Sequence, residues 1–117
     1  MFTVDRPIFD QWVEEAWIQI PNYFRSRIKN VSIEVEEDSR QGKKHSSRLL
    51  GLYVGVPLPE RSAASAEAPD RIILYKNNLE EISFSADDLK EQIRQTLWHE
   101  LGHYFGMKEK QIRRRGY

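Results

Sequence analysis

Apolar positions in the first third of the chain recur at helical spacing and then at strand spacing. Between Phe9 and Ile20 the apolar residues fall on one face of a helix, with polar residues between them, and Pro21 follows. This pattern predicts an amphipathic helix that ends before the proline. Residues 31–36 (VSIEVE) alternate between apolar and polar side chains, which is typical of a strand with one solvated face.

The middle of the chain carries two further apolar segments between stretches of another character. Residues 49–56 (LLGLYVGV) and 71–75 (RIILY) predict strands, the first of them ended by Pro57. We expect loops at 37–48, which is polar, and at 60–70, which is rich in alanine and serine. Segment 49–56 fits an edge strand, to which an extended peptide could add, and equally a central strand.

A long helix is predicted near the C-terminal end, after a short helix or turn at residues 77–83. Ser85, with Asp88 three positions later, resembles a helix-capping pair in which Asp replaces the usual Glu. One stripe of this helix is formed by Leu89, Ile93, Leu97 and Glu100. Gly106 is a natural end for the helix, and the charged segment 108–115 predicts a short final helix.

This order of elements predicts an α+β fold, a small sheet packed on helices, in one domain over residues 1–117. Lys+Arg and Asp+Glu number 18 each, so we expect no general attraction to nucleic acid or to acidic membranes. The chain contains no cysteine, which excludes disulfides and thiolate metal sites. We find no signal peptide and no apolar run of membrane-span length, and therefore expect a cytoplasmic protein without membrane contacts.

Residues 99–103 read His-Glu-Leu-Gly-His, and this motif carries the candidate chemistry. Two histidines four positions apart on a helix point the same way, roughly 5–6 Å apart, and can share one metal ion. Glu100 can then act as general base on a water at that metal. Zinc is the default ion for a site of imidazole and carboxylate with an open position. A helix that carries two histidines by chance is the alternative.

A catalytic zinc needs a third protein ligand, and only a short segment follows His103. Glu109 is the best candidate there, because Gly106 allows the chain to leave the helix and turn back. A solvated Glu109, with a water or an upstream carboxylate in its place, remains open at this point.

Three other residues bear on the candidate site. Tyr104 could bind an oxyanion, but a structural aromatic is the stronger interpretation. His45 lies in the polar loop and is expected to be solvated. Gly102 costs a helix about 1 kcal/mol relative to alanine, so we expect a strand to pack closely against it.

The segments GLYVGVPLPER (51–61), PDRIILYKN (69–77) and EQIRQTLWHELGHYFGM (91–107) resemble a family of small bacterial proteins, the minimal zincin-like metallopeptidases. The resemblance covers nearly the whole chain. It implies a stripped-down zincin core with a small mixed sheet, metal ligation at His99 and His103, and Glu100 as the base. The position three residues after Gly106 is a third histidine in metzincins and often an acid in the minimal family, and in this chain it is Glu109.

Three hypotheses about function follow. The first is a zinc-dependent peptidase that acts on a peptide or protein substrate. The second is a zinc-binding protein without catalysis, used for regulation or for binding a partner. The third is a metal-dependent RNA hydrolase, which the overall neutrality of the chain and the acid at Glu109 disfavour. The sequence indicates neither the physiological substrate nor the oligomeric state.

Overall fold

The computed structural model describes residues 1–38, 49–61 and 69–117. The elements follow the predicted order, with an additional helical turn after the first helix and another before the third strand. They are α1 (Arg6–Ile18), α2 (Asn22–Arg25), β1 (Val31–Glu36), β2 (Gly51–Val54), η1 (Leu58–Glu60), β3 (Asp70–Tyr75), α3 (Lys76–Glu81), α4 (Ala86–Tyr104) and α5 (Glu109–Arg114). The expectations for His45 and most of the two long loops fall outside the described residues.

The three strands form one mixed sheet in the order β1-β3-β2. Strand β3 pairs in parallel with β1, with Ile33 opposite Ile72, and antiparallel with β2, with Leu52 opposite Ile73. β3 is therefore central and β2 lies at an edge, which resolves the alternative that the sequence left open. β2 is shorter than the predicted strand, because only residues 51–54 pair with β3.

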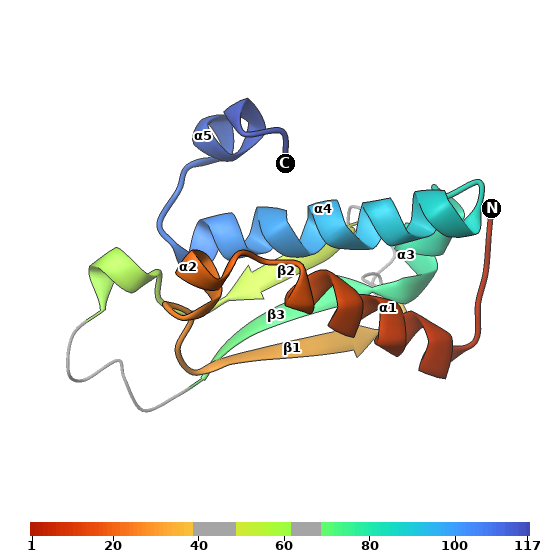
Figure 1. Ribbon diagram of the computed structural model, residues 1–117, viewed down its shortest axis with the longest axis horizontal. Helices are drawn as coiled ribbons and strands as arrows, with labels where there is room; N and C mark the ends of the chain where they lie inside the picture. Colours follow the sequence, from red (N-terminus) through yellow and green to blue (C-terminus); the bar gives the residue numbers. More distant parts are fainter. Residues whose placement is uncertain (39–48, 62–68) are drawn as a thin grey trace.

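Helices α1 and α4 pack on one face of the sheet (Figure 1). Their buried apolar stripes meet the side chains of β3 that point to this face. The core so formed includes Phe9 and Val13 from α1, Ile72 and Leu74 from β3, and Leu89, Ile93 and Leu97 from α4. The helical period of residues 9–20 and the predicted stripe of α4 are thus the core-facing sides of the two helices.

Both ends of α4 are made by local sequence. Ser85 Oγ accepts a hydrogen bond from the Asp88 N–H at 3.1 Å, and the Asp88 carboxylate accepts one from the Phe84 N–H at 2.9 Å. At the other end Gly106 has φ of 82°, and the N–H groups of Gly106 and Met107 bond back to the carbonyls of His103 and Gly102. This glycine-ended motif reverses the chain, so that α5 comes back against the C-terminal half of α4 (Figure 1).

The α+β fold predicted from the sequence is confirmed, with a three-stranded mixed sheet packed on helices. Within the described ranges, no helix combines the length and apolar character that crossing a bilayer requires.

Candidate metal centre

The two histidines of the motif lie on one face of α4, as their spacing predicts. The ring centroids of His99 and His103 are 5.2 Å apart. Each of these rings and the Glu100 carboxylate offers one ligand atom, and these atoms lie within 4.8 Å of one another. The structure therefore gathers the three polar residues of the motif at one place on the helix.

Helix α5 brings Glu109 to the same place. Glu109 Oε1 lies 2.7 Å from His99 Nε2 and 3.1 Å from His103 Nε2. Donor atoms around a tetrahedral zinc with bonds of 2.0–2.1 Å are roughly 3.3 Å apart. The Glu109 oxygen thus already stands near the donor spacing of a zinc site from each of the two imidazole nitrogens, and the chemistry of the three groups fits that ion.

Glu109 is held in its ionised form. Hydrogen bonds from His99 and then from Arg113 lower the pKa of Glu109 to about 2, against the opposing effect of its slight burial. The second oxygen of Glu109 accepts from Arg113 Nε at 3.1 Å. An anionic oxygen with a fixed partner on its other side is suited to bind a cation.

His99 is oriented by the chain that follows α5. Its Nδ1 lies 2.9 Å from the backbone oxygen of Tyr117, which can only accept, so Nδ1 donates there. Nε2 donates to Glu109 in this structure and is the nitrogen that would give up its proton to bind a metal. Burial lowers the pKa of His99, but the hydrogen bonds to Tyr117 and Glu109 outweigh that effect and raise it above its ordinary value. A second partner that fixes the tautomer in this way is typical of histidines that bind metals.

Glu100 stands beside this trio, toward strand β2. Burial raises the pKa of Glu100, although His103 and His99 and a hydrogen bond from the backbone of Tyr53 act to lower it. A partly buried carboxylate with a raised pKa is a better proton acceptor than a solvated one. The Tyr53 contact also shows that the outer edge of β2 faces the site.

Two hollows flank Glu100 along β2. One, of about 670 Å³, is lined by Tyr53, Pro57 and His103 among others. The other, of about 350 Å³, is lined by residues that include Gly51 and His99. Because Glu100 lines both, the surface is hollowed on either side of the metal candidate in the direction of the edge strand.

Gly102 makes a close contact, as expected, but the prediction that a strand makes it is wrong. Gly102 is buried, but a Cβ there would meet Ile112 Cγ1 of α5 at 2.8 Å. The strand approaches α4 at Gly51 instead, where a Cβ would lie 2.7 Å from Thr96 Cγ2. The missing side chain of Gly102 leaves a notch on α4 in which Ile112 of α5 packs. The missing side chain of Gly51 allows β2 itself to pack closely against α4.

Tyr104 is a structural residue, in agreement with the stronger interpretation of the sequence. Its ring is fully buried, and its hydroxyl accepts a hydrogen bond from the Lys29 N–H at 3.0 Å. It ties α4 to the segment before β1 and takes no part in the site.

A buried polar cluster beneath β2 was not anticipated from the sequence. Asp70 is only 3% exposed; it accepts a hydrogen bond from the Tyr53 hydroxyl and forms an ion pair with Arg61. Gly55 passes directly over it, where a Cβ would overlap the Asp70 side chain. The one hint in the sequence is a lone aspartate at the start of an apolar strand. This cluster fixes the strand whose backbone contacts Glu100.

Both a family model and a solved structure match this chain. The model of a family described as zincin-like metallopeptidase matches residues 28–117. The solved structure of a conserved hypothetical protein from T. thermophilus matches with a TM-score of 0.61 and 24% identity, over 87% of this chain and 94% of that one. At this identity the structural likeness concerns the fold alone. None of the curated proteins matches the chain.

Proposed function

The chain belongs to the zincin-like metallopeptidase family, and we propose that it is a zinc-dependent peptidase with Glu100 as its general base. The observation that carries this proposal is the convergence of three donors from two helices on one point. His99 and His103 come from α4 and Glu109 from α5, with Glu109 Oε1 within 3.1 Å of both imidazole nitrogens. Glu100 stands outside this trio.

The donor set suits zinc, with His99, His103 and Glu109 as ligands and one position left open. When bound, zinc supplies an electrophile for the scissile carbonyl and lowers the pKa of the attacking water. Glu100 would accept a proton from that water and deliver it to the leaving amine. The raised pKa that burial gives Glu100 supports this role, because it brings the carboxylate closer to the pKa of an efficient base.

The proposed substrate is a peptide in extended form, bound along the outer edge of β2. Among the residues that the structure describes, β2 pairs with β3 alone. Apart from the Tyr53 backbone group that contacts Glu100, the groups on its other edge could therefore pair with an added strand. The hollows on either side of Glu100 would receive substrate side chains on the two sides of the scissile bond.

Glu100→Gln tests the mechanism most sharply, because the amide keeps the shape and removes the base. We expect peptide cleavage to fall at least about a hundredfold, while zinc content stays at the wild-type level. Cleavage would be measured with a broad peptide library by mass spectrometry. Glu14→Gln, an exposed carboxylate on α1, is the matched control and is expected to cleave normally.

Three outcomes would redirect the assignment. Equal cleavage by Glu100→Gln and wild type would contradict Glu100 as the base. Bound zinc with no turnover of any peptide would favour the second hypothesis, a zinc-binding protein that engages a partner without catalysis. Affinity for RNA that falls steeply with salt would favour the hydrolase of RNA.

A further inference from the structure

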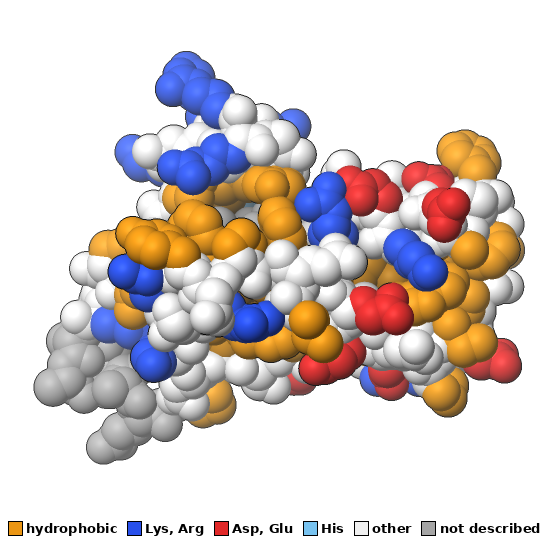
Figure 2. Space-filling view, in the orientation of Figure 1, with side chains coloured by type: hydrophobic (Ala, Val, Ile, Leu, Met, Phe, Trp, Pro, Cys, Tyr) orange, Lys and Arg blue, Asp and Glu red, His pale blue; other side chains and the backbone are white. Residues whose placement is uncertain are grey.

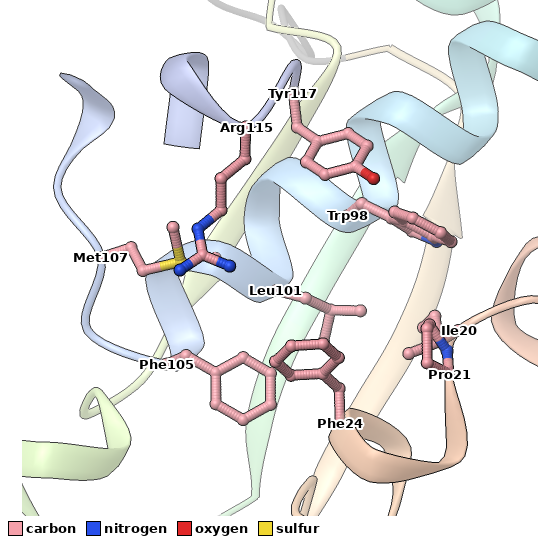
Figure 3. Close-up of a pocket in the computed structure, with 10 residues that line it drawn as sticks. Ile20, Pro21, Phe24, Trp98, Leu101, Phe105, Met107, Arg115 and Tyr117 are labelled. Atoms are coloured by element: carbon pink, nitrogen blue, oxygen red, sulfur yellow. The ribbon is translucent and has the colours of Figure 1, made fainter. Parts of the chain in front are cut away.

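A third hollow, of about 200 Å³, lies on the side of α4 turned away from the histidines. Its walls come from three elements that meet there: α2, the end of α4, and the chain around α5 (Figure 3). The apolar lining is mainly aromatic and includes Phe24, Trp98, Leu101, Phe105 and Tyr117. The space-filling view shows apolar side chains gathered between the upper helix and the body of the molecule (Figure 2).

The aromatic walls are held in place by neighbouring groups. The rings of Trp98 and Tyr117 lie 5.0 Å apart, and Arg94 stacks over Trp98 at 4.8 Å. On the opposite wall, Phe24 and Phe105 meet edge to face at 5.9 Å. A hollow with such fixed walls is preformed, so that a ligand would not have to order them.

One charged side chain, which is exposed to solvent, borders this apolar hollow. Arg115 lines the hollow, and its side chain extends toward Met107 (Figure 3). Arg94 and Arg113 have carboxylate partners in Glu91 and Glu109. Within residues 1–38, 49–61 and 69–117, however, no carboxylate pairs with Arg115. The hollow therefore offers apolar walls and one guanidinium that no carboxylate of the described chain engages.

We propose that this hollow binds a small molecule with an apolar body and a single carboxylate. An apolar body would replace water on the aromatic walls, and the carboxylate would take two hydrogen bonds from the guanidinium of Arg115. Sites for drug-sized ligands begin at about 300 Å³, so this smaller hollow suits an acid of roughly ten non-hydrogen atoms. The site goes beyond the proposed peptidase function and does not depend on it.

The test is an NMR titration of the full chain with 3-phenylpropionate and, separately, with its uncharged amide. We expect saturable shifts at the signals of Trp98, Phe105 and Tyr117 that exceed the shift at His99, whose Nδ1 contacts the Tyr117 backbone, while the signals of His103 stay unmoved. The acid should bind at least about tenfold more tightly than the amide, because only the acid forms a charge-assisted pair.

Variants test separately the contact of the carboxylate with Arg115 and the contact of the apolar body with the aromatic walls. Arg115→Gln should abolish the preference for the acid and leave the amide unaffected, whereas the neighbouring Arg114→Gln should keep it. Phe24→Ala, on a partly exposed wall residue, should weaken both ligands.

Three results would overturn the proposal. The first is equal binding of acid and amide, or an Arg115→Gln variant that binds like wild type. The second is a set of shifts centred on His99 and His103, which would place the acid in the metal centre. The third is self-association that covers the Trp98 face, seen as a mass that rises with protein concentration. None of these depends on peptide cleavage, so failure here is distinct from failure of the peptidase assignment.

Discussion

Gly51 and Gly102 shape the metal centre because they have no side chain, so that neighbouring elements can approach closely. Gly102 sits in the middle of the ligand helix, where alanine would favour the helix by about 1 kcal/mol. The missing Cβ makes the notch that Ile112 fills, with Ile112 Cγ1 only 2.8 Å from where that Cβ would stand. Since Ile112 and Glu109 share α5, the notch at Gly102 also determines how near Glu109 comes to the histidines.

Gly102→Ala tests this link at the scale of one methyl group. The added methyl should push α5 outward and weaken zinc binding at least about tenfold, even though it improves the helix propensity of α4. Zinc affinity would be measured by competition with a chromophoric chelator, and helix content by circular dichroism. The added methyl would also lie 2.9 Å from Ile112 Cδ1. Gly102→Ala/Ile112→Val removes this second close contact and should recover part of the affinity. A single variant with wild-type affinity would contradict the link.

At the scale of elements, the site depends on how two peripheral segments are attached to α4. α5 is attached through Ile112 and through the glycine-ended turn at Gly106. β2 contacts α4 through Gly51 against Thr96, and its Tyr53 hydroxyl is bonded to the buried Asp70 of β3. Both attachments lie between segments far apart in the sequence, so the geometry of the site is a tertiary property that α4 alone does not supply.

Asp70→Asn is expected to loosen the β2 side of the site. Loss of the charge leaves Arg61 without its buried partner, and we expect the free energy of unfolding to fall by about 2–4 kcal/mol. Urea denaturation would measure the change. Asp87→Asn, at an exposed position in the first turn of α4, should cost under about 1 kcal/mol. Equal effects of the two variants would show that the cluster adds no stability.

An ion pair between β1 and β3 makes a pH-dependent contribution to the stability of the fold. Arg71 Nε and Nη2 donate to the two oxygens of Glu34 at 2.8 and 2.9 Å, and this bonding lowers the pKa of Glu34 below its ordinary value. A carboxyl whose pKa is lower in the folded state stabilises the fold above its unfolded pKa and loses that contribution as pH falls. Glu34→Gln should therefore lower the melting temperature at pH 7 and have little effect near pH 3. A decrease of the same size at both pH values would contradict this contribution.

At the scale of the whole molecule, local patterns predicted the elements and the ligand helix, and tertiary packing supplied the rest. The period of residues 9–20, the alternation at 31–36 and the motif at 99–103 depend on neighbours in sequence, and each is found as expected. The spacing after Gly106 pointed to Glu109, and the structure places that residue beside both histidines.

The residues that pack against Gly51, Gly102 and Asp70 could not be predicted from local sequence patterns. Which element fills a notch depends on how helices and strands meet in space, and the pattern of one chain does not encode that directly. The strand expected at Gly102 was therefore the wrong neighbour, and the Tyr53–Asp70–Arg61 cluster was missed. The hollow around Arg115 likewise joins α2 to the chain after α4, segments with no shared pattern.

Metal content is the decisive measurement for the zinc site proposed at His99, His103 and Glu109. Wild type, His99→Ala and Glu109→Ala would be purified in parallel and analysed by inductively coupled plasma mass spectrometry, with His45→Ala as the histidine control. We expect about one zinc per chain in wild type and His45→Ala, almost none in His99→Ala, and weakened binding in Glu109→Ala. A wild-type protein that is free of metal and takes up no added zinc would rule out this site.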